Sequence, residues 1–198
     1  MGRIAMLAGA LTVGAVFCHQ SQAVAQTLVE VRVAQTKYRY VDGNYTFGNS
    51  AVVDVFYVGT PGSNEFNLGG GYAFKRGAFV LTPLLYVVFD TEGSERGAKV
   101  ALLAAFGKDG WNLLSFFGQY VPISGTVRSY QVLDTLDFTR TIGTRWEAGV
   151  QAGFFHASDA WNAQIGPVLK RNDHLGAWAA SYRFGDQNEF RIGRVLTF

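Results

Sequence analysis

The sequence predicts an all-β fold: an antiparallel, up-and-down β-barrel that crosses a membrane. Apolar and polar residues alternate over most of the chain, which is the two-residue period of β-strands. The 24 glycines, the four prolines and the aromatic content of 15% suit strands and tight turns better than helices. The alternating segments are 10–14 residues long. This length fits a tilted membrane span of about 9–11 residues and exceeds the roughly 5–6 residues of soluble strands.

The first 25 residues have the organisation of a secretory signal peptide. A single positive charge at Arg3 precedes an almost uninterrupted apolar run over residues 4–18, and Ala-Val-Ala at 23–25 is a small-x-small cleavage pattern. The apolar run is 15 residues long, short of the roughly 20 that a membrane-spanning helix needs. We therefore expect residues 1–25 to be the signal peptide and residues 26–198 to be a single barrel domain.

The composition that remains after cleavage excludes several classes of function. Cys18 is the only cysteine, and the bulky Phe17 before it does not suit a lipidation signal, so the mature chain has no thiol and no disulfide. Removing Arg3 from the 17 basic residues leaves 16, against 15 acidic residues. This near-neutral balance gives no basis for binding nucleic acid. The sequence shows no metal-ligand cluster and no phosphate-binding glycine loop, so we expect no metal and no cofactor.

The two faces of the alternating segments differ in a way that favours a membrane barrel over a soluble sandwich. The apolar faces begin or end with aromatic residues, such as Phe66 and Phe74 in one segment and Trp146 and Phe154 in another. The opposite faces are rich in glycine and in charges of both signs. In a transmembrane barrel the apolar face contacts lipid, with aromatic girdles at both interfaces, and the polar face lines the lumen.

Alternation and turn residues define the predicted strands and their number. In chain order the strands are 28–40, 48–58, 64–74, 78–89, 98–107, 111–122, 127–139, 143–156, 160–170, 174–184 and 189–198. Short turns separate them, for example at Val41-Asp42-Gly43-Asn44. Bacterial single-chain barrels have an even number of strands, whereas these segments number eleven.

One of the eleven assignments must therefore be wrong. The segment 127–139 is the weakest, because alternation places Asp134 on its lipid face between Val132 and Leu136. We expect about ten strands, with this segment forming a loop. Twelve strands are the alternative, if a strand near the N-terminus is missed, and eight would require several clean hairpins to merge.

The end of the sequence carries a family resemblance. Phe190, Ile192, Leu196 and Phe198 form one face of the last strand, and the sequence ends on Phe198. This pattern resembles the C-terminal signature of bacterial outer-membrane β-barrel proteins. The resemblance implies an outer-membrane location, contact with lipid and lipopolysaccharide, and recognition by the barrel-insertion machinery. Arg194 shares this face, so it would point at lipid without an obvious partner.

The inward-facing charges indicate the function. By alternation the lumen is lined by Glu30, Arg32, Asp54, Glu65, Lys99, Arg145, Glu147, Lys170, Arg183, Glu189 and Arg191. Positive and negative charges are nearly balanced, and closure of the barrel would bring the first and last strands together. The sequence therefore favours a narrow porin-like channel for a small-molecule solute, with a charged lumen. The alternative is a structural or assembly-partner barrel whose interior is filled by salt bridges.

A third hypothesis is a lipid-modifying hydrolase. His156 and Ser158 lie two residues apart at a strand end, on the lipid side, and this pair resembles the outer-membrane lipid A deacylases. The resemblance covers three residues, and the nearby Asp159 lies on the opposite face, where it could not orient the imidazole. The other interpretation is a polar pair at the membrane–water interface beside Trp161.

Overall fold

The computed structural model describes residues 26–91, 96–125, 127–158 and 160–198. The predicted signal peptide, residues 1–25, lies outside the described residues. No helix within these ranges is long and apolar enough to cross a bilayer. The strands are β1 (Gln26–Ala34), β2 (Arg39–Thr46), β3 (Ala51–Thr60), β4 (Ser63–Tyr72), β5 (Phe74–Arg76), β6 (Phe79–Asp90), β7 (Arg96–Lys108), β8 (Trp111–Ser124), β9 (Tyr130–Ile142), β10 (Trp146–Ala157), β11 (Ala160–Asp173), β12 (Gly176–Gly185) and β13 (Glu189–Thr197).

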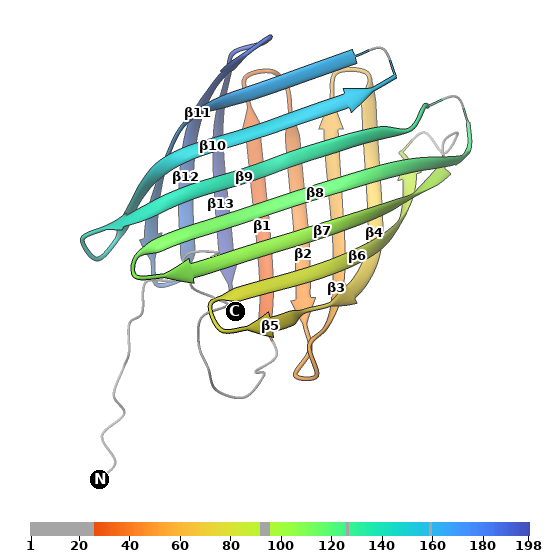
Figure 1. Cartoon of the computed structure of the whole chain (residues 1–198). Coiled ribbons are helices and arrows are strands. Elements are labelled where there is room, and N and C mark those ends of the chain that lie inside the picture. The colour runs from red at the N-terminus through yellow and green to blue at the C-terminus, as the bar shows by residue number, and fades with distance from the viewer. Residues whose placement is uncertain (1–25, 92–95, 126, 159) are drawn as a thin grey trace.

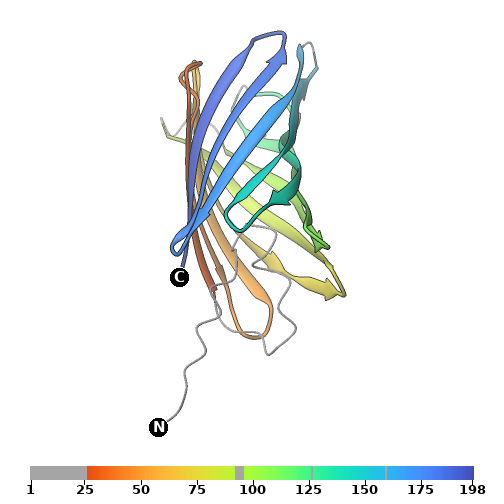
Figure 2. The same ribbon diagram turned by 90° about the vertical axis from the view of Figure 1, so that its left-hand side faces the viewer.

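The strands form one antiparallel sheet that closes on itself (Figures 1 and 2). β1 pairs with β13, and β4 pairs with β6. β5 continues β4, because Gly71 pairs with Leu84 and Phe74 with Leu81 in one unbroken register. The described strands therefore make twelve positions around the barrel. The expectation of about ten strands is wrong, and the twelve-strand alternative is correct.

The missing strand lies near the N-terminus. The predicted strand 28–40 is two strands, β1 and β2, joined by a turn at residues 35–38. This turn contains neither glycine nor proline, and Lys37 adopts the positive φ of 68° that the reversal needs. The turn expected at residues 41–44 lies instead inside β2, where Asp42 is buried.

The segment 127–139, expected to be a loop, contains most of strand β9. Its register shifts around Asp134: Leu133 pairs with Phe117, whereas the next paired residue, Thr135, pairs with Phe116. The extra residue is a β-bulge, which reverses the side-chain alternation beyond it. Asp134 consequently contributes to the interior of the barrel and not to the lipid face that simple alternation predicts.

The barrel has two rims. The C-terminal rim carries the ends of the described chain, where Thr27 and Phe198 exchange backbone hydrogen bonds of 3.0 and 3.2 Å. The turns of the β2–β3, β5–β6, β7–β8, β9–β10 and β11–β12 connections lie at this rim. The far rim carries the β1–β2, β3–β4 and β12–β13 turns.

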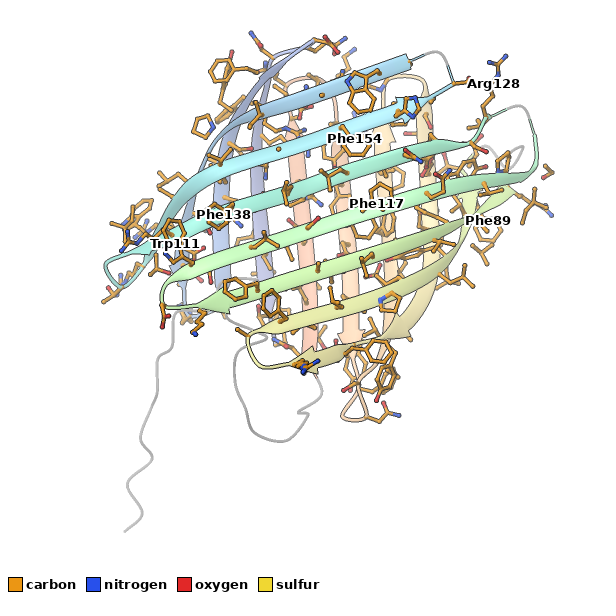
Figure 3. All side chains as sticks on the ribbon, viewed as in Figure 1. Phe89, Trp111, Phe117, Arg128, Phe138 and Phe154 are labelled. Atoms are coloured by element: carbon orange, nitrogen blue, oxygen red, sulfur yellow. The ribbon has the colours of Figure 1, made fainter. Side chains whose placement is uncertain are left out.

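The outer wall is apolar. Large side chains such as Leu85, Trp161 and Ile165 have 60%, 60% and 58% of their surface exposed. Aromatic side chains gather towards both rims: Trp111 and Phe138 lie near the C-terminal rim, and Phe89 lies towards the far rim (Figure 3). Such a wall with two aromatic girdles is the surface of a barrel that faces lipid.

Candidate functional site: the interior of the barrel

The interior has two sides of different chemistry. One, which we call the core side, lies on β2, β3 and β6–β8, and almost all of the buried apolar cluster belongs to it. The other, the polar side, lies on β1 and β9–β13 and carries most of the buried charged and amide groups. Strand β6 shows the difference most clearly: it is apolar on both faces, with Leu84, Tyr86 and Val88 inward and Leu85 and Val87 outward.

Aromatic rings of the core side meet across the lumen. The ring of Phe56 on β3 lies 5.1 Å from that of Tyr86 on β6 and 5.9 Å from that of Phe116 on β8. Both contacts are edge-on, the arrangement that the ring quadrupoles favour. Three positions around the barrel, β4, β6 and β7, separate β3 from β8. The Phe56–Phe116 contact therefore narrows the lumen from wall to wall.

A cluster of arginines and acids crosses the lumen on the polar side. We call Arg32, Asp134, Arg183, Glu189 and Arg191 the Asp134 cluster. Arg32 Nη1 on β1 donates to Asp134 Oδ2 at 2.5 Å, and Arg191 Nη1 lies 3.4 Å from Asp134 Oδ1. The guanidinium groups of Arg183 and Arg191 both contact Oε1 of Glu189.

Neighbouring residues complete the Asp134 cluster. The Tyr38 hydroxyl donates to Asp134 at 3.0 Å, and Thr36 donates to Glu189 at 2.6 Å. Gly153 leaves room for the cluster, because a Cβ at this position would lie 2.7 Å from Arg183 Nη1 and 2.8 Å from the backbone oxygen of Leu133. Buried charges need partners of this kind, since an unpaired charge in a protein interior is very costly.

Towards the C-terminal rim the polar side continues as a hydrogen-bonded network. Lys170 Nζ lies 2.6 Å from Asp137 Oδ2, and the Gln151 amide donates to Asp137 Oδ1 at 2.8 Å. Ser181 in turn donates to Gln151 at 2.8 Å. Glu147, which is 1% exposed, accepts from the Thr139 hydroxyl and the Asn172 amide at 3.0 and 3.1 Å.

A further ion pair lies in the lumen near the far rim. Lys99 Nζ on β7 lies 2.9 Å from Glu65 Oε2 on β4, and the Tyr130 hydroxyl on β9 donates to Glu65 Oε1. The ammonium group also lies 5.2 Å from the ring centre of Phe56, within cation–π range. Lys99 thus links the charged residues of this region to the aromatic contacts of the core side.

Two buried carboxylates of the core side have no ion-pair partner among the described residues. Asp42 on β2 and Asp54 on β3 are 9% and 5% exposed. The Asn44 amide donates to one oxygen of Asp54 at 2.8 Å. The Oδ1 atoms of both aspartates are buried without a hydrogen-bond partner among the described residues. Both side chains line the inner of the two interior cavities.

The described residues of the interior line an outer and an inner cavity. The outer cavity has a volume of about 550 Å³ and includes Thr36, Pro61 and Gln187 of the far-rim turns, so it opens at that rim. The inner cavity has a volume of about 110 Å³ and lies towards the C-terminal rim. Tyr40, Phe116 and Arg191 line both cavities and form the boundary between them.

Most of the charges assigned to the lumen by alternation lie around these cavities. The side chains that line them are Glu30, Arg32, Asp54, Glu65, Lys99, Lys170, Arg183, Glu189 and Arg191. Glu147 is buried on the same wall. Arg145 does not line the lumen as predicted. It lies exposed in the turn between β9 and β10, because β10 begins one residue later, at Trp146.

Three cavity-lining acids were missed by sequence reasoning. Asp42 was assigned to a turn because it precedes Gly43, and Asp134 and Asp137 lay in the segment taken as a loop. With these additions, seven acidic and five basic side chains of the described chain line the two cavities. The near balance inferred from the sequence is replaced by an acidic excess.

The candidate hydrolytic pair lies on the outer wall near the far rim. The His156 ring packs at 61° to Trp161, with ring centres 5.5 Å apart. The Ser158 hydroxyl accepts a hydrogen bond of 2.9 Å from Arg128. The surface pocket that holds both residues is lined by no carboxylate within the described ranges, and Asp159 lies outside them.

Arg194, which alternation placed towards lipid without a partner, has one. It lies on the outer wall near the C-terminal rim, where its Nη1 and Nη2 atoms donate to Asp173 at 2.8 and 2.9 Å. Its guanidinium carbon also lies 5.0 Å from the centre of the Trp178 ring. This bidentate pairing explains how a charge is accommodated on this face.

Comparison with solved structures identifies the class of fold. No family model matches the sequence, and no curated protein sequence matches it. The structure is similar to that of the KdgM porin, with a TM-score of 0.64 and 12% identity over 87% of this chain and 99% of that one. The NanC porin gives a TM-score of 0.57 with 13% identity, over 86% of this chain and 98% of that one.

A second structure of the first of these proteins was determined in complex with disordered oligogalacturonate, and it matches with a TM-score of 0.65 and 11% identity over the same shares of the two chains. At these identities the similarity concerns the fold. The chain folds as a closed antiparallel β-barrel whose architecture is similar to that of these porins.

Proposed function

We propose that this protein is a narrow, porin-like channel for small solutes in the bacterial outer membrane. The observation that supports this proposal most directly is a barrel of twelve strand positions whose interior still holds the two cavities described above. Barrels of about eight strands have interiors just wide enough for side chains to fill. The fold shared with the two porins supports the same proposal.

The two cavities suggest how solute would pass. The outer cavity, at about 550 Å³, is within the range of roughly 300–1,000 Å³ typical of small-molecule sites. The inner cavity, at about 110 Å³, exceeds the 10–15 Å³ or so that one water requires. Passage between them is limited by Tyr40, Phe116 and Arg191. We infer that the outer cavity receives the solute and that this boundary selects it by size.

The charges of the lining suggest which solutes pass. Acidic side chains outnumber basic ones along the path by seven to five, and acidic linings favour cations. Oligogalacturonate, which is bound to one structural neighbour, is a polyanion. Its transport is therefore not expected here, and we propose small cationic or neutral solutes.

Membrane insertion is part of the proposal. Phe190, Ile192 and Phe198 have 40%, 43% and 70% of their surface exposed on the last strand. An outward apolar face of this kind is compatible with recognition by the barrel-insertion machinery and with contact to outer-membrane lipid and lipopolysaccharide.

Single-channel recording tests the channel. Full-length protein, refolded and added to a planar bilayer, should give discrete conductance steps, and a heat-denatured sample should give none. A small steady conductance is expected, because the boundary between the cavities is narrow. Silent bilayers with protein that is demonstrably folded would contradict the proposal.

The alternative, a structural barrel with a filled interior, draws support from one specific observation. The Arg32–Asp134 pair and the Tyr130–Glu65 hydrogen bond both cross the lumen between strands that are at least four positions apart around the barrel. A rigid, non-conducting barrel would be silent in bilayers, and its loss would perturb the envelope or a co-purifying partner.

A further inference from the structure

A row of alternating tryptophans and arginines runs across the outer wall near the C-terminal rim. Trp146 on β10 pairs with Arg171 on β11, which pairs with Trp178 on β12, which pairs with Arg194 on β13. On the neighbouring hairpin, Trp111 on β8 pairs with Arg140 on β9. Side chains directly opposite each other in an antiparallel sheet are in contact distance. We call these six residues the Trp–Arg row.

Each arginine of the Trp–Arg row lies over a tryptophan ring. The guanidinium carbon is 5.2 Å from the ring centre in the Arg140–Trp111 pair and 5.7 Å in the Arg171–Trp146 pair. These cation–π contacts hold the arginines flat against the wall. Trp111 also stacks on Phe138, with ring planes 11° apart, and Figure 3 shows both rings at the end of the wall near the turns. The row is therefore an ordered surface.

The tryptophans fix the depth of this surface in the membrane. Trp side chains concentrate at the level of the lipid headgroups. A positive charge on the lipid face costs about 2–4 kcal/mol at the midplane and about 0–1 kcal/mol near the interface. Arginines that contact these tryptophans accordingly lie at headgroup depth, where an anionic phosphate is within reach.

The arginines of the Trp–Arg row differ in whether their charge is already neutralised. Arg194 is paired with Asp173. Arg140 and Arg171 are exposed and form no ion pair with any described residue. They are therefore free to chelate a phosphate in the bidentate geometry that guanidinium favours. On the other half of the same rim, the rings form two packed pairs, Tyr45 with Phe47 and Tyr72 with Phe74, and no arginine of the described residues lies over them.

From this arrangement we propose that the Trp–Arg row is a binding site for the headgroup phosphates of anionic phospholipids, held mainly by Arg140 and Arg171. The acyl chains would lie along the apolar wall of β8–β11, beside side chains such as Val150, Ile165 and Leu169. The site is on the outer wall, so it is independent of conduction through the lumen.

Native mass spectrometry of the full barrel tests the proposal. Protein is released from mixed micelles that contain phosphatidylglycerol or phosphatidylcholine, and the retained lipids are counted. We expect retention of phosphatidylglycerol, and binding about 30-fold weaker in the Arg140→Gln/Arg171→Gln double variant, given the contribution of two basic residues at a membrane surface. The matched control is Arg39→Gln/Arg96→Gln, which removes two exposed cations of β2 and β7 from the far rim. It should retain phosphatidylglycerol as the wild type does.

Three results would overturn the proposal. They are equal retention of the two lipids by the wild type, equal losses in the row and control variants, and a lipid-free dimer that only the row variant abolishes, which would make the row a protein contact. If the glutamine variant fails to fold, Arg140→Lys/Arg171→Lys serves instead: it keeps the charge but removes the bidentate guanidinium geometry, so retention of phosphatidylglycerol should fall relative to the wild type and to Arg39→Lys/Arg96→Lys. Unchanged retention in a folded lysine variant would also contradict the proposal.

Discussion

The core side and the polar side of the barrel solve the same problem by different means. Both must fill the inward face of a closed sheet, yet the core side does so with rings such as Phe56 and Tyr86, and the polar side with paired charges such as Arg32 and Asp134. The stability of an apolar core falls gradually as its side chains lose volume. Removing one member of a buried ion pair, in contrast, leaves an uncompensated buried charge. We infer that the apolar rings act as a rigid support and that the charged side chains lining the cavities determine which ions the lumen admits.

The largest effect is expected from Asp134→Asn. The substitution removes the negative charge shared by Arg32 and Arg191 and one of the two acceptor oxygens, and loss of one partner of a buried ion pair costs about 3–5 kcal/mol. Urea unfolding measures this loss, with the folded and unfolded protein distinguished by their different electrophoretic mobilities. Asp173→Asn, on the exposed outer wall, is the control and should cost less than about 1 kcal/mol. Equal losses in the two variants would remove the distinction between the interior network and surface pairs.

Phe56→Ala tests the core side. Removal of a ring that is 5% exposed should lower the free energy of unfolding by about 3 kcal/mol, the lower end for a buried phenylalanine. Because Phe56 meets Phe116 across the lumen, single-channel conductance should rise while ion selectivity stays unchanged. A change in selectivity without a change in conductance would contradict the inference that the apolar rings support the barrel and the charged side chains select ions.

Gly153→Ala sharpens the account of the Asp134 cluster. The added Cβ would come within 2.7 Å of Arg183 Nη1 and 2.8 Å of a backbone oxygen at the bulge. Overpacking of this kind costs about 1–3 kcal/mol, and we expect the free energy of unfolding, measured by urea titration, to fall by that amount. Gly43→Ala is the matched control, since its Cβ would meet only the backbone oxygen of Val55, at 4.0 Å.

The smallest loss of stability is expected from Asp42→Asn/Asp54→Asn. Neither carboxylate has an ion-pair partner within the described residues, and an unpaired buried charge is costly, so a neutral replacement of the same shape should leave the free energy of unfolding unchanged or higher. The same variant removes two acidic groups from the inner cavity and should weaken any preference for cations in bilayer recordings. An unchanged selectivity would show that the inner cavity is not on the conduction path.

Alternation in the sequence predicted the barrel and most of its interior charges, because the two-residue period of a strand does not depend on tertiary context. It failed where the period gives no signal. Even-numbered residues point into the barrel both before and after the turn at residues 35–38, as Arg32 and Tyr40 do. No break in the pattern marks that hairpin, and its reversal is made by Lys37 and not by glycine.

The bulge at Asp134 produces the opposite failure. Before the bulge the even-numbered Tyr130 points inward. After it the odd-numbered residues Thr135, Asp137 and Thr139 point inward, so the inward positions change from even to odd numbers within one strand. Without the neighbouring strands, such a change looks like the end of a strand. The long-range partners of the interior, Asp134 with Arg32 above all, follow from barrel closure, which local sequence cannot specify. The pairing of Arg194 with Asp173 crosses β12 and was hidden for the same reason.

The proposed function requires that solute pass along an interior in which acidic side chains outnumber basic ones. The reversal potential of the wild-type channel in a KCl gradient tests this requirement. We expect a potential whose sign corresponds to K⁺ passing more readily than Cl⁻, and which shifts towards zero in Asp42→Asn/Asp54→Asn. A channel that prefers Cl⁻, or folded protein that conducts nothing, would contradict it.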